Sequence, residues 1–145
     1  MKALIQRVRS ASVEIAGETV GEISQGLLLF LGIEKGDNEQ KADKLLDRIF
    51  KYRVFADQNK RMNLSLNDTR GGLLIISQFT LVANTHKGLR PSFSAAAGVE
   101  ESELLYDYFV NEARKSSLRI ETGQFGADMK VSLLNDGPVT FNFQV

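Results

Sequence analysis

The sequence predicts one α+β domain over residues 1–145, with a mostly antiparallel or mixed sheet that curls towards a barrel and with two main helices. Three observations predict it. Strand-like segments occur at both ends of the chain and between the helical segments. Only two segments show the period of an amphipathic helix, and they do not alternate regularly with strands. A chain of 145 residues can bury one substantial core but is too short for two ordinary domains.

The N-terminal third is predicted to form strands. Residues 3–8 are strand-like, and residues 13–15 alternate between apolar and polar side chains before a turn at residues 16–18. The continuous apolar run at residues 27–31 is typical of a strand that is buried on both faces.

A helix is predicted after this run. Asp37 is the expected N-cap, because Gln40 follows it at the spacing of a capping box. The apolar side chains that follow recur every three or four residues and form one stripe: Ala42, Leu45, Leu46, Ile49 and Phe50. Lysines and arginines line the opposite side, so the exposed face of this helix is expected to be basic.

A second buried strand is predicted for residues 73–82, although its apolar run breaks at Ser77-Gln78. The second helix is predicted for residues 100–115, with glutamates near its start and basic residues near its end, as the helix dipole favours. Its expected inner face consists of Leu105, Tyr108 and Phe109.

The chain ends with two alternating segments, residues 129–133 and 139–145. Between them lies Asn135-Asp136-Gly137-Pro138. From the residues alone we expect an ordinary turn here, since Asp-Gly favours turns and proline can begin a strand. A trans Gly-Pro bond is the default expectation.

Composition excludes several kinds of catalytic site. The chain has no cysteine, which rules out disulfides and thiolate nucleophiles, and it has one histidine, His86, which would have to serve as the base of any Ser-His-Asp triad. No cluster of acidic residues and histidine has the spacing of metal ligands, so we expect neither a metal nor a cofactor.

Charge and hydropathy indicate a cytoplasmic protein without a membrane segment. No apolar run approaches the roughly 18 residues that span a bilayer, and the first residues become polar too early for a signal peptide. With 18 basic and 18 acidic residues the net charge is zero, which argues mildly against an obligate nucleic-acid binder but leaves room for a local basic surface.

Two polar segments stand out as candidate sites. Residues 77–80 place hydroxyl and amide groups where a buried strand should continue, although a strand end whose hydroxyls satisfy nearby backbone would look the same. The other segment is residues 135–138. His86 is more simply explained as an exposed loop residue, and no partner is apparent that would make Asp128 a general base. The residues alone leave the reaction open.

Together the two segments are far more specific than either alone. SQFTL at residues 77–81 and NDGPVT at residues 135–140 resemble the paired signature of the D-aminoacyl-tRNA deacylases, formerly called D-tyrosyl-tRNA deacylases. Residues 5–8, 90–93 and 125–129 match further segments of that family in the same order. The resemblance therefore covers essentially the whole chain.

This resemblance implies an enzyme that hydrolyses the carboxylic ester of D-aminoacyl-tRNA, held by its acceptor end, and that forms a homodimer with active sites at the subunit interface. The residues implied to line the pocket for the ester are Ser77, Gln78, Phe79 and Thr80. The Gly137-Pro138 segment is implied to be a cis peptide that enters from the partner chain and leaves no room for an L side chain.

Further roles follow from the same resemblance. Arg7 is implied to brace the Gly-Pro segment, and Phe125 and Met129 are implied to lie beside the pocket. Glycyl-tRNA has no side chain to exclude, so it is an expected second substrate. Lys87, Arg90 and the basic face of the first helix are candidates for contact with phosphate, and ordinary solvated surface charge explains them equally well.

Mechanistically, we expect backbone N–H groups near Phe79 and Thr80 to stabilise the oxyanion, with the terminal 2′-hydroxyl of the tRNA positioning the water. Covalent attack by Thr80 is the other mechanism considered, but the sequence offers no convincing base. Two further functions stay open: a small-molecule esterase with a Ser or Thr nucleophile, which would need His86 nearby, and a non-catalytic RNA-binding module.

Overall fold

The computed structural model describes residues 1–86 and 88–145 and confirms a single α+β unit. Its strands are β1 (Lys2–Ile15), β2 (Glu18–Ile23), β3 (Gly26–Gly32), β4 (Phe55–Ala56), β5 (Met62–Leu64), β6 (Gly72–Ser77), β7 (Ile120–Thr122) and β8 (Lys130–Gln144). Its helices are α1 (Glu39–Lys51), α2 (Leu66–Thr69), α3 (Val99–Arg114) and the 3-10 turn η1 (Phe79–Val82). No helix in the described part of the chain is both long and apolar enough to cross a membrane.

The main sheet is mixed and nearly closes into a barrel. Its strand order is β2-β1-β3-β6-β7, with β8 on the other edge of β1. The pairs that involve β1 are antiparallel, whereas β3–β6 and β6–β7 are parallel. The sheet curls until β2 approaches β7: a β-carbon added at Gly21 would lie 2.7 Å from the carbonyl oxygen of Thr122.

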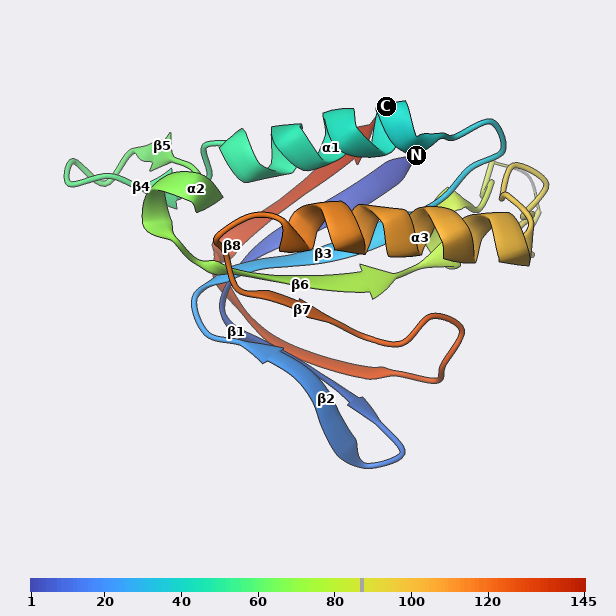
Figure 1. The fold of residues 1–145 in the computed structure, drawn as a ribbon, viewed down its shortest axis with the longest axis horizontal. Coiled ribbons are helices and arrows are strands. Elements are labelled where there is room, and N and C mark those ends of the chain that lie inside the picture. Colours follow the sequence, from blue (N-terminus) through green and yellow to red (C-terminus); the bar gives the residue numbers. More distant parts are fainter. Residues whose placement is uncertain (87) are drawn as a thin grey trace.

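Helices α1 and α3 lie side by side over one face of the sheet (Figure 1). The apolar stripe predicted for α1 packs there against alternate residues of β3 and β6, among them Leu29 and Ile75. The other face of these strands carries Leu28 and Leu74, which are buried in a second cluster with β1 and β2. The prediction that residues 27–31 are buried on both faces is therefore confirmed.

The start of α1 differs from the prediction. Asn38, and not Asp37, is the N-cap, and its side chain accepts a hydrogen bond from the Lys41 N–H. Asp37 is instead drawn towards the N-terminus of the chain, because its carboxylate is the partner of a buried cation there. The Asp37 side chain is only 1% exposed.

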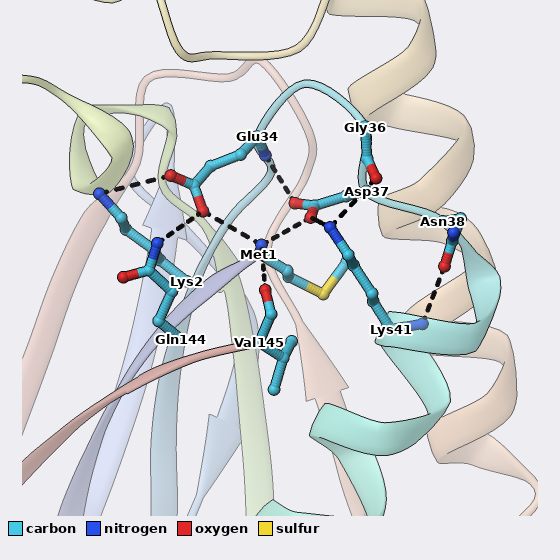
Figure 2. A network of polar contacts seen from close by, with 9 residues as sticks. All are labelled: Met1, Lys2, Glu34, Gly36, Asp37, Asn38, Lys41, Gln144 and Val145. Atoms are coloured by element: carbon cyan, nitrogen blue, oxygen red, sulfur yellow. Dashed lines mark hydrogen bonds and ion pairs between the residues drawn. The ribbon is translucent and has the colours of Figure 1, made fainter.

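Figure 2 shows this network. The α-ammonium group of Met1 donates to Asp37 Oδ1 at 2.6 Å, to Glu34 Oε2 at 3.1 Å and to the Val145 carbonyl oxygen at 3.1 Å, which satisfies its three N–H donors. The other Asp37 oxygen accepts the Glu34 N–H at 2.7 Å. The network therefore joins both ends of the described chain to the loop before α1.

Three further predictions need correction, and one short helix was missed. Residues 73–82 are not one strand, since β6 ends at Ser77 and η1 follows. Tyr106, rather than Tyr108, is the buried tyrosine of α3. The helix α2 was not expected, although Ser65 and Asp68 form a capping box at its start. The two C-terminal segments form one strand, β8, so residues 135–138 are not a turn between strands.

Candidate active site

A cavity of about 400 Å³ lies at the carboxyl end of β6. Three segments form it: the end of β6 with the start of η1, the loop that enters α3 together with the first turn of α3, and the loop between β7 and β8. The side chains that line it are mostly apolar. They include Ile76, Ala96, Ala97, Val99, Phe125, Met129 and Val131, with Ser77, Gln78, Ser102 and Asp128 as the polar members.

The polar break at the end of β6 has a structural cause. The Gln78 N–H still pairs with the Leu31 carbonyl oxygen at 2.8 Å, but the backbone of Gln78 then leaves the strand conformation and η1 begins at Phe79. The Gln78 side chain turns along this corner and donates to Thr80 Oγ1 at 2.5 Å. Ser77 and Gln78 thus face the cavity, whereas Thr80 is exposed beside it.

The opposite wall is supported from behind by α3. The Tyr106 hydroxyl donates to the Ile75 carbonyl oxygen at 2.9 Å, and its ring lies 5.8 Å from that of Phe125, which lines the cavity. Burial, and then the charge of Asp107, raise the pKa of Tyr106 above its usual value. The phenol is therefore neutral at physiological pH and acts as a fixed donor within the wall.

The rim of the cavity is apolar and exposed. Phe79 is 63% exposed and its ring lies 5.0 Å from that of Phe93, while Val99 is 75% exposed. Asp128 is exposed and forms an ion pair with Lys130 at 2.9 Å. His86 is also exposed. Lys87, expected to contact phosphate, lies outside the described residues.

The Asn135–Val139 segment protrudes from β8 instead of reversing the chain. The pairing of β8 with β1 jumps from Gln6↔Thr140 to Val8↔Asn135, which leaves residues 136–139 outside the ladder. The Asn135 side chain replaces the missing ladder bonds, because its Oδ1 accepts the Val139 N–H at 2.7 Å and its Nδ2 donates to the Val139 carbonyl oxygen at 3.2 Å. We call residues 135–139 the β8 protrusion.

Arg7 holds the β8 protrusion from below. Its Nε donates to the Asp136 carbonyl oxygen at 2.8 Å, and its Nη1 donates to the Val54 carbonyl oxygen. At the tip, the Gly137-Pro138 peptide is cis, as the family resemblance implied, and both residues are exposed. Gly137 has a φ of +149°, and a β-carbon there would lie 2.6 Å from Val139 Cγ2, so only glycine fits well.

The residues predicted for the site therefore fall into two groups. Ser77, Gln78, Phe79, Phe125 and Met129 come together around the cavity, and Thr80 lies next to them. Arg7, Gly137 and Pro138 form the other group, and among the described residues they are not part of the cavity lining.

The sequence prediction missed the contribution of the segment that enters α3. Ala96, Ala97, Val99 and Ser102 line the cavity from this side. Val99 and Ser102 precede Tyr106 and Phe109 at the spacing of one helix face, so extending that face towards the helix start would have found them. Ala96 and Ala97 carry no such signal. They are placed by hydrogen bonds between the 95–97 segment and Ile33 and Lys35.

Comparisons with known sequences agree with one another. The family model described as D-Tyr-tRNA(Tyr) deacylase matches residues 4–144. Proteins named D-aminoacyl-tRNA deacylase from Pseudoalteromonas translucida and Aeromonas hydrophila are each 59% identical to this chain, and one from Serratia proteamaculans is 56% identical. Each of these alignments covers 100% of both proteins.

Comparisons with solved structures show the same fold. A structure of the "c-Myc DNA Unwinding Element Binding Protein" matches with a TM-score of 0.94 at 38% identity, over 100% of this chain and 99% of that chain. A structure of "a probable eukaryotic D-amino acid tRNA deacylase" matches with a TM-score of 0.84 over 99% of this chain and 98% of that one. Its identity is 15%, so this likeness shows the fold alone.

Proposed function

The chain belongs to the D-Tyr-tRNA(Tyr) deacylase family, and on that premise we propose that it hydrolyses the ester bond of D-aminoacyl-tRNA, releasing a D-amino acid and tRNA. The observation that carries this proposal is the cavity at the end of β6, where Ser77, Gln78 and Phe79 meet Phe125 and Met129. An apolar hollow that is lined by a few polar groups suits a small esterified group at the end of a larger molecule. We assign the activity to the cytoplasm, where aminoacyl-tRNA is used.

The N–H groups of Phe79 and Thr80 are the proposed oxyanion donors. Phe79 and Thr80 are the first two residues of η1, and the first N–H groups of a helix have no carbonyl partner within that helix. They adjoin Ser77 and Gln78, which line the cavity. Donors that are fixed before the reaction stabilise the tetrahedral intermediate of acyl transfer by several kcal/mol, typically about 3–4 for one donor.

Thr80 is proposed to bind substrate and not to attack it. Its hydroxyl accepts a hydrogen bond from the Gln78 amide nitrogen, which cannot take up a proton. A threonine nucleophile needs an adjacent base, and none contacts Thr80 among the described residues. We therefore favour hydrolysis assisted by the terminal 2′-hydroxyl of the tRNA, which is feasible because an aminoacyl ester is already activated.

Chirality is proposed to be read by the β8 protrusion of a second subunit. Three observations support a homodimer with shared sites: Gly137 and Pro138 are exposed, they are braced from below by Arg7, and they take no part in the cavity of their own chain as described. The neighbouring Leu134 is 57% exposed, as expected of a surface that is covered in the dimer. Inserted beside the partner's cavity, this backbone would exclude an L side chain. It would admit glycyl-tRNA.

A paired assay tests the proposal. Wild-type protein is expected to deacylate D-tyrosyl-tRNA rapidly and to leave L-tyrosyl-tRNA intact. Gly137→Ala should lose much of this difference, because its β-carbon displaces Val139 or Arg7 and so shifts the tip. Gly17→Ala is the matched control, since Gly17 also has a positive φ (+85°) but has open space around it in the turn before β2.

Each other outcome has a definite meaning. Equal hydrolysis of both esters by the wild type would leave an esterase and remove the proposed role of the β8 protrusion. No hydrolysis of either ester by folded protein would favour a non-catalytic RNA-binding module. Labelling by a fluorophosphonate would favour an esterase with a Ser or Thr nucleophile.

A further inference from the structure

The molecule is neutral as a whole but strongly polarised. Both α1 and α3 point their C-terminal ends towards the same end of the molecule, where α2, β4 and β5 also lie (Figure 1). Residues 44–70 and 112–121, which form this end, contain ten basic and five acidic residues. Residues 33–43, which form the loop before α1 and its first turn, and residues 99–107, which form the first half of α3, contain two basic and eight acidic residues. One end of the molecule is therefore basic and the other acidic.

Seven exposed basic side chains of this end form no ion pair with another described residue: Lys44 and Arg48 on α1, and five beyond α1, which are Arg53, Lys60, Arg61, Arg70 and Arg114. By contrast, Lys51, Lys115 and Arg119 nearby are each paired with a carboxylate. The two remaining carboxylates of this end already accept hydrogen bonds: Asp57 from the backbone of Asn59 and Arg61, and Asp68 from Ser65. We use the term basic end for the part of the molecule that carries the five side chains beyond α1.

Helix electrostatics explain only part of this pattern. Basic residues in the last turn of a helix are stabilised by its dipole, which accounts for Arg114 in α3. Arg53 lies in the loop after α1, and Lys60 and Arg61 lie between β4 and β5, so the dipole does not account for them. Five like charges at one end of the molecule repel one another, and such a concentration of charge is suited to a polyanion.

The basic end and the cavity lie at opposite ends of strand β6. Strand β6 begins two residues after Arg70 and ends at Ser77 in the cavity wall. At about 3.3 Å per residue, this six-residue strand separates the two by roughly 20 Å. Stacked nucleotides advance by about 3.4 Å, so an RNA whose 3′ end occupies the cavity can present phosphates about six nucleotides further along at the basic end.

We infer that the basic end binds the phosphate backbone of the acceptor stem of the tRNA whose 3′ end is in the cavity. This inference rests on the proposed function, because it takes the cavity to hold the aminoacyl end. It adds a second contact region, formed by α2, the β4–β5 turn and the end of α3, at which affinity is set by backbone charge and not by sequence. The D-amino acid is then recognised at one end of the molecule and the RNA at the other.

The test compares two substrates with two double variants. The substrates are D-tyrosyl-tRNA and the 3′-ester of D-tyrosine with adenosine, which has no stem. Arg53→Gln/Arg61→Gln removes two charges from the basic end. The control, Glu103→Gln/Asp107→Asn, changes two exposed charges of α3 near the acidic end. KM and kcat are measured at several salt concentrations, and circular dichroism checks that each variant is folded.

Arg53→Gln/Arg61→Gln is expected to raise KM for D-tyrosyl-tRNA about tenfold at low salt and to reduce the slope of log KM against log salt by about two. Its kinetics with the adenosine ester should be unchanged, and so should the salt slope of the control. An unchanged KM and slope with tRNA would overturn the inference. An equal loss with both substrates would also overturn it, because the effect would then arise at the cavity. Failure of the wild type on both substrates would instead refute the proposed function.

Discussion

Replacing Asp37 by asparagine tests the polar network that joins both ends of the described chain. The Asp37 side chain is 1% exposed and receives three donors: the Met1 ammonium at 2.6 Å, the Glu34 N–H at 2.7 Å and the Lys41 ammonium at 3.1 Å. Asparagine preserves the volume. However, it removes the negative charge, and its NH₂ group must face at least one of these donors.

The cost follows from the burial of the partner. The Met1 ammonium is also buried, so losing Asp37 leaves a buried cation with Glu34 as its remaining charged partner. Removing one member of a buried pair costs about 3–5 kcal/mol. The entropy of unfolding is about 2.1 cal/mol/K per residue, or roughly 0.3 kcal/mol/K for 145 residues. The expected fall in Tm is therefore about 10–16 °C.

Urea and thermal unfolding of tag-free protein, followed by circular dichroism, measure this change. Asp47→Asn is the matched control. Asp47 is also on α1 and forms an ion pair with Lys51 at 2.6 Å, but the side chains of both residues are more than half exposed. Such a pair contributes about 0.3–0.5 kcal/mol. A loss below 1 kcal/mol in Asp37→Asn would refute the assignment of this ion pair as a major stabilising contact.

Three further predictions concern the site. Thr80→Ala should keep measurable deacylase activity in a D-tyrosyl-tRNA assay, and complete loss from a folded, tRNA-binding variant would make Thr80 the nucleophile. Tyr106→Phe should lose about 1 kcal/mol at neutral pH, because the hydrogen bond to Ile75 is lost. Burial raises the pKa of Tyr106, so above about pH 10 this tyrosine ionises in the unfolded chain before it does in the folded protein. In urea titrations, the free energy of unfolding of the wild type should therefore fall more steeply with pH in this range than that of Tyr106→Phe. Equal slopes of the free energy of unfolding against pH would contradict this. Asn135→Ala should lower the free energy of unfolding by roughly 1–3 kcal/mol, because the Val139 N–H loses its partner. It should also reduce the preference for the D-ester over the L-ester. An unchanged preference would show that the β8 protrusion does not determine selectivity.

Local patterns predicted most of the fold because they are enforced by burial. The apolar run at residues 27–31 avoids water when it forms a strand that is covered on both faces, and the stripe of α1 avoids water when it packs on the sheet. Both are buried as expected. The N-cap of α1 was mispredicted for a reason that no local pattern carries. Asp37 and Asn38 are both good caps, and the choice is made by the Met1 ammonium, 36 residues away in sequence.

The lining of the candidate cavity was predicted where polar residues interrupt an apolar pattern, and it was missed where they do not. Ser77 and Gln78 break a buried strand, so they were found from the sequence. Ala96 and Ala97 resemble any small loop residues, and hydrogen bonds of Ala95 and Ala97 with the loop before α1 bring this segment to the cavity. The cis conformation of Gly137-Pro138 was implied only by the family resemblance, since the residues themselves favour a trans bond and a turn.

The β8 protrusion explains why a turn signal was misleading. The Asp136-Gly137 pair favours a chain reversal when backbone hydrogen bonds must close the loop. Here the Asn135 side chain supplies those bonds, and Arg7 of the facing strand holds the Asp136 carbonyl oxygen, so the strand continues on the far side of the loop. The protein thus uses polar side chains to hold backbone in place. The mechanism proposed for the activated ester requires fixed backbone donors and a rigid wall, and neither of these needs a histidine or cysteine side chain.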